Sequence, residues 1–338
     1  RAAVRTLVIS DLHLGNRGGR DVLRRADPLE RLTEAVAQVD RLVLLGDLAE
    51  LVRRNPESSM AATERVLRAL AARMDSSQEI IVVPGNHDRP LIRGWARARG
   101  RALGVADTVP PDATPALIRI ASWLAPAPVR IHYPGVWLAD GLYATHGHYL
   151  DRHLTPHAPI GLPRRSRSDR AGIRVTAWDY EHRRIRARQR RDGPRSPMSR
   201  AAHMATRALN PALPRLLMRA GLSPVTAAAV DLQMRHAALP ALRTVLRRLG
   251  IEAETVIFGH VHRLGPVAGD RPGDWRAEGG LQVLNTGSWI YERLLIDRTR
   301  PPHPYWPGGA IRIDEGHAPR TLNLLEDLDH PQLWTPDR

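Results

Sequence analysis

The sequence of 338 residues contains no cysteine, no lysine and only one phenylalanine. The absence of cysteine excludes disulfides and thiolate metal sites, so any metal must be held by His, Asp, Glu or Asn. No apolar run reaches the roughly 18 residues that a membrane-spanning helix requires. Eight tryptophans and an apolar fraction of 43% still supply enough side chains for a large core.

The charge of the chain is concentrated in one segment. The formal net charge is +15, and all 50 basic residues are arginines. Residues 151–250 hold 21 arginines against six acidic residues, so this segment carries the net charge of the whole chain. The missing lysine indicates a bias of the entire sequence, and only the segregation of arginine into one segment points to phosphates. A basic segment of this kind is typical of contact with nucleic acid or an anionic membrane surface. A solvated or disordered surface segment is an equal alternative to an anion-binding role for the run Glu181–Arg191.

The first 90 residues alternate between strand and helix patterns. Apolar runs at 4–9, 42–45 and 80–83 predict buried strands, and apolar positions with helical spacing at 29–39 and 60–73 predict helices between them. A β-α-β-α-β order indicates a parallel sheet with crossover helices. The first strand begins almost at once, with no apolar secretory segment before it. We therefore expect a cytoplasmic protein, with peripheral contact at the membrane as an alternative.

The remainder of the chain divides into a second strand region and an insertion. A hairpin is predicted at 136–144, and strand signals resume at 255–258, 281–284 and 310–313. We therefore predict one domain from residues 1–150 and 251–325, a basic helical insert or cap at 151–250, and a loose tail at 326–338.

Five short polar blocks stand in order along the chain, each after an apolar strand. They are Asp11-Leu12-His13, Gly46-Asp47, Gly85-Asn86-His87-Asp88, His146-Gly147-His148 and Gly259-His260-Val261-His262. Open α/β sheets place their sites at such strand ends, and alternate residues of an extended segment point the same way. Five blocks in this order favour a metal site over chance loop polarity.

These blocks resemble the calcineurin-like metallophosphoesterase family, whose pattern is D-x-H, G-D, G-N-H-[D/E], a lone H and G-H-x-H. The resemblance covers about 1–150 and 251–315. It implies an α/β fold, a four-layered α/β/β/α sandwich of two mixed sheets, here with a helical insert.

The resemblance also implies roles for individual residues. One metal would be held by Asp11, His13, Asp47 and His262, and a second by Asp47, Asn86, His146 and His260, with Asp47 bridging. His87 would protonate the leaving group, oriented by Asp88. Three further residues are expected to contact substrate: His148, Asn285 and Trp289.

The predicted chemistry is hydrolysis of a phosphate ester. Two cations neutralise the phosphate charge and acidify a bridging water, whose hydroxide would attack phosphorus, while a separate acid protonates the leaving oxygen. Ligands of His, Asp and Asn without sulfur suit Mn²⁺, Fe²⁺ or Zn²⁺, and we expect Mn²⁺ as the activating ion. The substrate is an anionic phosphodiester, diphosphate or phosphomonoester.

The insert is the best clue to the substrate. Its place between the fourth and fifth blocks is similar to the cap of the UDP-2,3-diacylglucosamine diphosphatases. That subfamily typically has Arg where this chain has His87, so we do not expect this chain to catalyse the reaction of that subfamily. Two alternatives stay open: a nuclease or nucleic-acid processing enzyme that uses the basic insert, and a non-catalytic interaction protein on the same fold. We also expect that residues 155–245 can be replaced by a linker without loss of basal hydrolysis.

Overall fold

The computed structural model describes residues 4–16, 18–52, 56–154, 175–182, 227–228, 230–232, 234–277 and 279–334. Most of the predicted insert, with the arginine run from Arg183 onward, lies outside the described residues. No helix among the described residues is long and apolar enough to span a membrane.

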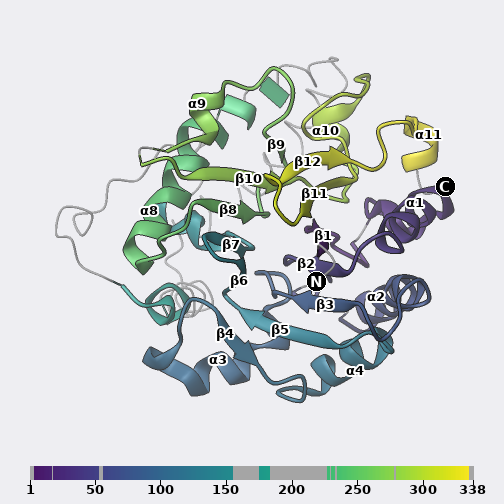
Figure 1. The fold of residues 1–338 in the computed structure, drawn as a ribbon. Coiled ribbons are helices and arrows are strands. Elements are labelled where there is room, and N and C mark those ends of the chain that lie inside the picture. The colour runs from purple at the N-terminus through teal and green to yellow at the C-terminus, as the bar shows by residue number, and fades with distance from the viewer. Residues whose placement is uncertain are drawn as a thin grey trace, which may run out of the picture.

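The first sheet has seven strands and contains the predicted parallel unit (Figure 1). In spatial order they are β12 (Arg320–Asn323), β11 (Gly309–Asp314), β1 (Arg5–Ile9), β2 (Arg41–Leu44), β3 (Glu79–Val82), β5 (Val129–Tyr133) and β4 (Asp107–Val109). Strands β1, β2, β3 and β5 run parallel, whereas β11, β12 and β4 pair antiparallel with their neighbours. The sheet is therefore mixed.

The second sheet has five strands and is also mixed. In spatial order they are β6 (Gly135–Ala139), β7 (Leu142–Thr145), β8 (Thr255–Phe258), β10 (Gln282–Thr286) and β9 (Leu264–Gly265). The β6–β7 pair is the predicted hairpin, and β7, β8 and β10 are parallel. Strands from both sides of the insert thus pair directly, because β7 precedes it and β8 follows it.

Alternation of side chains along the strands builds the four layers. In β2, Leu42 and Leu44 face an outer cluster of buried residues, while Val43 and the following Leu45 face a second cluster between the sheets. Ile257 of β8 joins that inter-sheet cluster from the opposite sheet. Residues buried on both faces explain why these strands read as continuous apolar runs.

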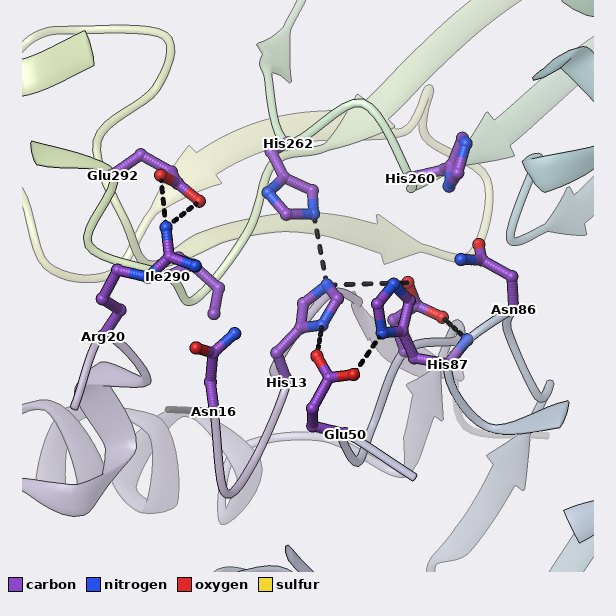
Figure 2. Close-up of a pocket in the computed structure, with 11 residues that line it drawn as sticks. His13, Asn16, Arg20, Glu50, Asn86, His87, His260, His262, Ile290 and Glu292 are labelled. Carbon is purple, nitrogen blue, oxygen red and sulfur yellow. Dashed lines mark hydrogen bonds and ion pairs between the residues drawn. The ribbon is translucent and has the colours of Figure 1, made fainter. Parts of the chain in front are cut away.

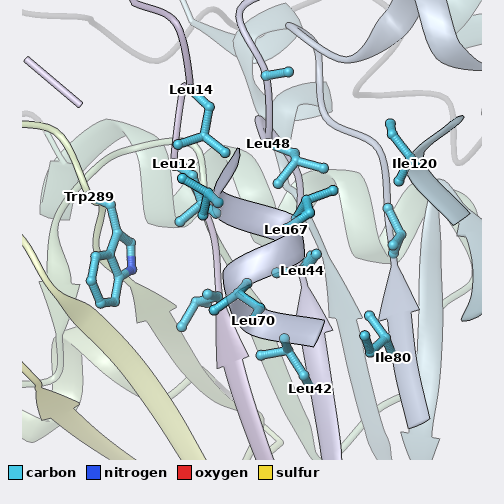
Figure 3. Close-up of a cluster of buried hydrophobic side chains, with 14 of the residues drawn as sticks. Leu12, Leu14, Leu42, Leu44, Leu48, Leu67, Leu70, Ile80, Ile120 and Trp289 are labelled. Atoms are coloured by element: carbon cyan, nitrogen blue, oxygen red, sulfur yellow. The ribbon is translucent and has the colours of Figure 1, made fainter. Parts of the chain in front are cut away.

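Helices cover the outer faces of both sheets. Helices α1 (Ala26–Val36), α2 (Pro56–Ala71) and α4 (Pro115–Trp123) pack on the first sheet, where Leu67, Leu70 and Ile120 lie in the outer cluster (Figure 3). Shorter helical segments are η1 (Val22–Arg24), η2 (Arg89–Leu91), α3 (Arg93–Arg99), η3 (Gly100–Ala102), η4 (His148–His153), α9 (Pro272–Trp275), α10 (Arg293–Ile296) and α11 (His330–Leu333).

Helix α8 (Leu239–Leu249) forms the fourth layer, although its residues fall within the predicted insert. Its buried Leu242 and Leu246 pack with Val256 and Phe258 of β8. A π-helical turn, η6 (Met234–Ala238), leads into it, and Met234 is buried in the same cluster. Residues 234–250 therefore belong to the sandwich itself.

The C-terminal segment is packed, in contrast to the expected loose tail. Leu333 of α11 is fully buried, and Asp329 begins this helix with a capping box to Gln332. The ring of Trp334 stacks on Tyr291, with centroids 5.5 Å apart. The expectation fails for residues 326–334 because Leu328, Leu333 and Trp334 pack against the outer hydrophobic cluster.

Candidate metal centre

The five polar blocks meet where the ends of both sheets converge. Asp11, Asp47 and Asn86 follow strands of the first sheet, whereas His146 and His260 follow strands of the second. Six of these residues line a cavity of about 190 Å³ (Figure 2): His13, Asp47, Asn86, His87, His260 and His262. Asp11 and His146 lie close enough to members of this set to share a metal ion with them. The site thus draws its residues from both halves of the sandwich.

One group of potential ligands consists of Asp11, His13 and His262. Oδ1 of Asp11 lies 3.2 Å from Nε2 of His262 and 3.7 Å from Nε2 of His13. The Nε2 atoms of the two histidines are 3.2 Å apart. These three side chains, which are three of the four members of the first predicted ligand set, therefore lie within reach of one ion.

A second group consists of Asp47, His146 and His260. Oδ2 of Asp47 is 3.3 Å from Nε2 of His146 and 3.5 Å from Nε2 of His13. Asp47 therefore lies between the two groups. Nδ1 of His146 is 3.0 Å from the carbonyl oxygen of Leu45, which orients Nε2 toward Asp47.

The backbone at these ligands is unusual. Asp11, His13, Asp47, His260 and His262 all have positive φ angles, of 56°, 45°, 51°, 72° and 57°. Residues other than glycine adopt this conformation at a cost of about 1–3 kcal/mol, and such residues cluster at functional sites. Strain at five ligands indicates that the loops are shaped for the site at the expense of stability.

Two glycines allow the loops to approach each other. A Cβ atom at Gly46 would lie 2.4 Å from the ring of His146, and one at Gly85 would lie 2.3 Å from Oδ1 of Asp47. Any larger residue at either position would displace a ligand.

The donor atoms fit divalent cations. Oδ1 of Asp11, Oδ1 of Asn86 and Nε2 of His146 are buried and have no hydrogen-bond partner among the described residues. Buried polar atoms are rarely left in this state, and ions satisfy them. Burial alone lowers the pKa of His146, but the charges of Asp47 and Asp11 outweigh it and raise the pKa to about 9. The negative field of the carboxylates thus attracts positive charge to this point.

His87 lies beside both groups and is held by Glu50. Nδ1 of His87 is 2.7 Å from Oε1 of Glu50, and its Nε2 is 3.9 Å from Oδ2 of Asp47. The expectation that Asp88 orients His87 is wrong. Asp88 is fully buried, and its carboxylate accepts backbone hydrogen bonds from Leu48, Ala49 and Gly85 at 2.9–3.0 Å.

The three expected substrate contacts lie below the surface of the site. His148 is 2% exposed, and its Nε2 is 3.3 Å from the hydroxyl of Tyr133. Asn285 is fully buried and donates to the carbonyl of Gly259 at 2.8 Å, which supports the loop before His260. Trp289 is also fully buried in the outer cluster. None of the three side chains is among the residues that line the cavity.

Several residues that the sequence analysis did not select line the cavity. They are Asn16, Arg20, Glu50, Ile290 and Glu292. Glu50 stands three residues after Asp47, and a carboxylate so close to a block was the one available signal. Asp151 was missed as well, although Oδ1 of Asp151 lies 2.7 Å from Nε2 of His260.

The short described segment at 175–182 within the insert contacts the core beside the site. Glu181 is 1% exposed, accepts a hydrogen bond from the hydroxyl of Tyr133 at 2.5 Å and lies 3.0 Å from Nη2 of Arg89. The ring of Tyr180 stacks on Tyr149, with centroids 4.8 Å apart. Because Arg89 directly follows Asp88, this segment is fixed to the loop that carries His87.

Comparison with known proteins identifies the class. The model of the calcineurin-like phosphoesterase family matches residues 4–188, more than half of the chain, and the chain belongs to this family. No curated protein matches it. Among solved structures, a dimetal phosphatase from Danio rerio is 15% identical, with a TM-score of 0.38, over 96% of this chain and all of that one.

The chain is accordingly a metal-dependent phosphoric ester hydrolase with the mixed-sheet sandwich that the sequence predicts. The family is dinuclear, and the described part of the chain holds three overlapping groups of His and Asp side chains that could bind metal, the third being His13, Asp47 and His87.

Proposed function

We propose that the protein hydrolyses a phosphodiester or diphosphate bond, with His87 as the acid for the leaving group. The observation that carries this proposal is the place of His87, whose ring lines the cavity beside Asp47 while Glu50 holds its Nδ1. When bound, the ions would supply charge neutralisation and acidification of water. The proposed ligands are Asp11, His13, Asp47 and His262 for one ion, and Asp47, Asn86, His146 and His260 for the other.

The residues around the cavity support proton transfer from His87. With Nδ1 directed to Glu50, Nε2 is the atom that donates a proton to the departing oxygen. Burial raises the pKa of Glu50, but its hydrogen bonds with His13 and His87 outweigh burial and lower the pKa to about 2. Glu50 therefore stays ionised at neutral pH and can accept the hydrogen bond from Nδ1 of His87 that fixes the ring.

Mn²⁺ is the proposed activating ion. The donor set of imidazole, carboxylate and amide oxygen, without any sulfur, supports Mn²⁺, Fe²⁺ or Zn²⁺ over softer metals. Purified protein freed of metal and then loaded separately with each ion would rank them by the rate of bis-p-nitrophenyl phosphate hydrolysis. No hydrolysis of bis-p-nitrophenyl phosphate, p-nitrophenyl phosphate or UDP-glucose with any of the three ions would overturn the proposed function.

We also propose that the arginine-rich part of the insert contacts an anionic surface. Its charge supports this, since Arg183, Arg184, Arg186, Arg188, Arg190 and Arg191 stand within nine residues. Changing these six to glutamine should abolish salt-sensitive binding to anionic vesicles or to single-stranded DNA and retain hydrolysis of the small diester. Binding of DNA alone would favour the nuclease alternative, and binding of neither would exclude the contact. The cytoplasmic location stays a prediction.

A further inference from the structure

The cavity extends past the metal-binding side chains in one direction. Figure 2 shows Arg20 and Glu292 on one side of His13 and His262, with Asn86 and His260 on the other side. Arg20 is the one arginine among the eleven described residues that line the cavity.

The backbone of Arg20 is fixed relative to the metal-binding loops. Its carbonyl accepts a hydrogen bond from the amide of Tyr291 at 2.7 Å, and the next residue, Asp21, forms an antiparallel bridge with Ile290. The amide of Trp289 in the same segment donates to the carbonyl of Asp11 at 3.1 Å. Arg20 and the ligand Asp11 are thus held by one short stretch of chain.

The guanidinium of Arg20 is paired with Glu292 in a way that leaves room for a ligand. Both hydrogen bonds come from Nη1, at 2.9 Å and 3.1 Å to the two carboxylate oxygens. The side chains are 37% and 24% exposed. Partly exposed ion pairs contribute little, so an incoming anion can compete with Glu292 for this arginine. A guanidinium binds a phosphate through paired hydrogen bonds, as it also binds a carboxylate.

We propose that Arg20 forms a subsite for a second phosphate group, next to the phosphate that is hydrolysed. The natural substrate then belongs to the diphosphates, and Glu292 weakens the subsite by competing for Arg20. This inference rests on the proposed function, because it assumes that the reacting phosphate binds at the metal centre.

The test compares UMP and UDP, which differ by one phosphate, as inhibitors of bis-p-nitrophenyl phosphate hydrolysis by the Mn²⁺-loaded full chain. Free Mn²⁺ is held constant, and calorimetry measures the same two affinities without turnover. We expect UDP to bind about tenfold or more tightly than UMP, in line with one added charge-assisted contact. Arg20→Gln should remove this preference, and Glu292→Gln should enlarge it.

Opposite effects of the two substitutions separate a binding role from a structural one, since a merely structural pair would be weakened by either change. Arg24→Gln is the matched control, because Arg24 stands four residues after Arg20 in η1, pairs with Asp21 at 3.1 Å and does not line the cavity. It should leave the UDP preference unchanged, and thermal melting checks that every variant folds. An unaltered preference in Arg20→Gln, or none in the wild type, overturns the inference. If the protein hydrolyses no substrate but calorimetry still shows tighter binding of UDP than of UMP, the proposed function is overturned and the subsite is not.

Discussion

Oε1 of Glu50 lies 2.7 Å from Nδ1 of His87, and this contact directs the opposite nitrogen of the ring toward the cavity. The carboxylate also approaches Nδ1 of His13, at 3.5 Å, so Glu50 links the proposed acid to a proposed metal ligand. Proton transfer and ligand geometry thus share one side chain.

The first prediction concerns this pair. His87→Gln should lower kcat by about 10²–10⁴ on esters with poor leaving groups and by much less on p-nitrophenyl esters, whose leaving oxygen needs little protonation. Glu50→Gln should give a smaller loss, and little further loss when His87 is already replaced, because both act in one step. Equal losses for His87→Gln on good and poor leaving groups would exclude His87 as the acid.

The second prediction concerns the bridging position of Asp47. Asp47→Ala should bind neither ion tightly, because Oδ2 of Asp47 stands between both groups of ligands. Elemental analysis after metal loading measures the stoichiometry, which should be close to two in the wild type. Asp40→Ala is the control, since Asp40 pairs with Arg5 on the surface. A full complement of metal in Asp47→Ala would refute the assignment.

The third prediction concerns Asp151, which accepts a hydrogen bond from Nε2 of His260 at 2.7 Å. This contact leaves Nδ1 of the ring for an ion and fixes its direction. Loss of such a supporting carboxylate typically weakens metal affinity about 10–100-fold. We expect Asp151→Asn to weaken one of the two binding steps in a metal titration and to spare the other. Asp140→Asn, in the exposed hairpin turn, should weaken neither; a matching effect there would point to a nonspecific loss of charge.

The fourth prediction is a pH dependence of stability. Burial raises the pKa of Glu181, but contacts with His148, Arg89 and Tyr133 outweigh burial and lower it to about 2. The folded-state pKa is therefore below the ordinary value of 4.5, so the carboxylate stabilises the fold above that pH. This stabilisation, on the order of 3 kcal/mol, should disappear as the pH falls from about 4.5 to 2. Denaturant unfolding of the wild type and Glu181→Gln should show stabilities that converge over this range; parallel curves would contradict the assignment.

The fifth prediction replaces the earlier expectation that residues 155–245 can be removed. The deletion would take away the buried Glu181, which pairs with Arg89, and Met234, Leu239 and Leu242 of the outer layer. We expect a protein that fails to show a cooperative melting transition, because an unpaired buried charge and a large exposed apolar face are each destabilising. Normal melting of the deleted chain would show that the second sheet does not need this layer.

The sequence revealed the strands and the ligand blocks for a simple physical reason. Strands such as β2 and β8 are buried on both faces, so their apolar runs are unbroken, and the polar block follows at once where the strand ends. Helix α8 lies within the segment that the sequence predicts to be a helical insert, but the sheet that it covers could not be predicted, because an apolar helix face does not specify its partner.

The remaining errors come from contacts between distant residues. Arg20 and Glu292 are 272 positions apart, and neither stands in a motif. His148 is part of the fourth block and Trp289 follows strand β10, yet only the packing around them shows that they are buried. Asp88 is adjacent to His87 in sequence, but its carboxylate accepts hydrogen bonds from the amides of Leu48 and Ala49 in the loop after β2 and of Gly85 in its own loop.

The division of the proposed ligands between the two sheets has a consequence for the resistance of the protein to proteolysis. Asp11 and Asp47 follow strands of one sheet, and His146 and His260 follow strands of the other. Ions bound by both sets would therefore cross-link the two sheets. Ligands that bind only the folded state stabilise it in proportion to their affinity. Chelation should therefore leave a chain that proteases cut more readily, and metal starvation would reduce the amount of enzyme as well as its activity.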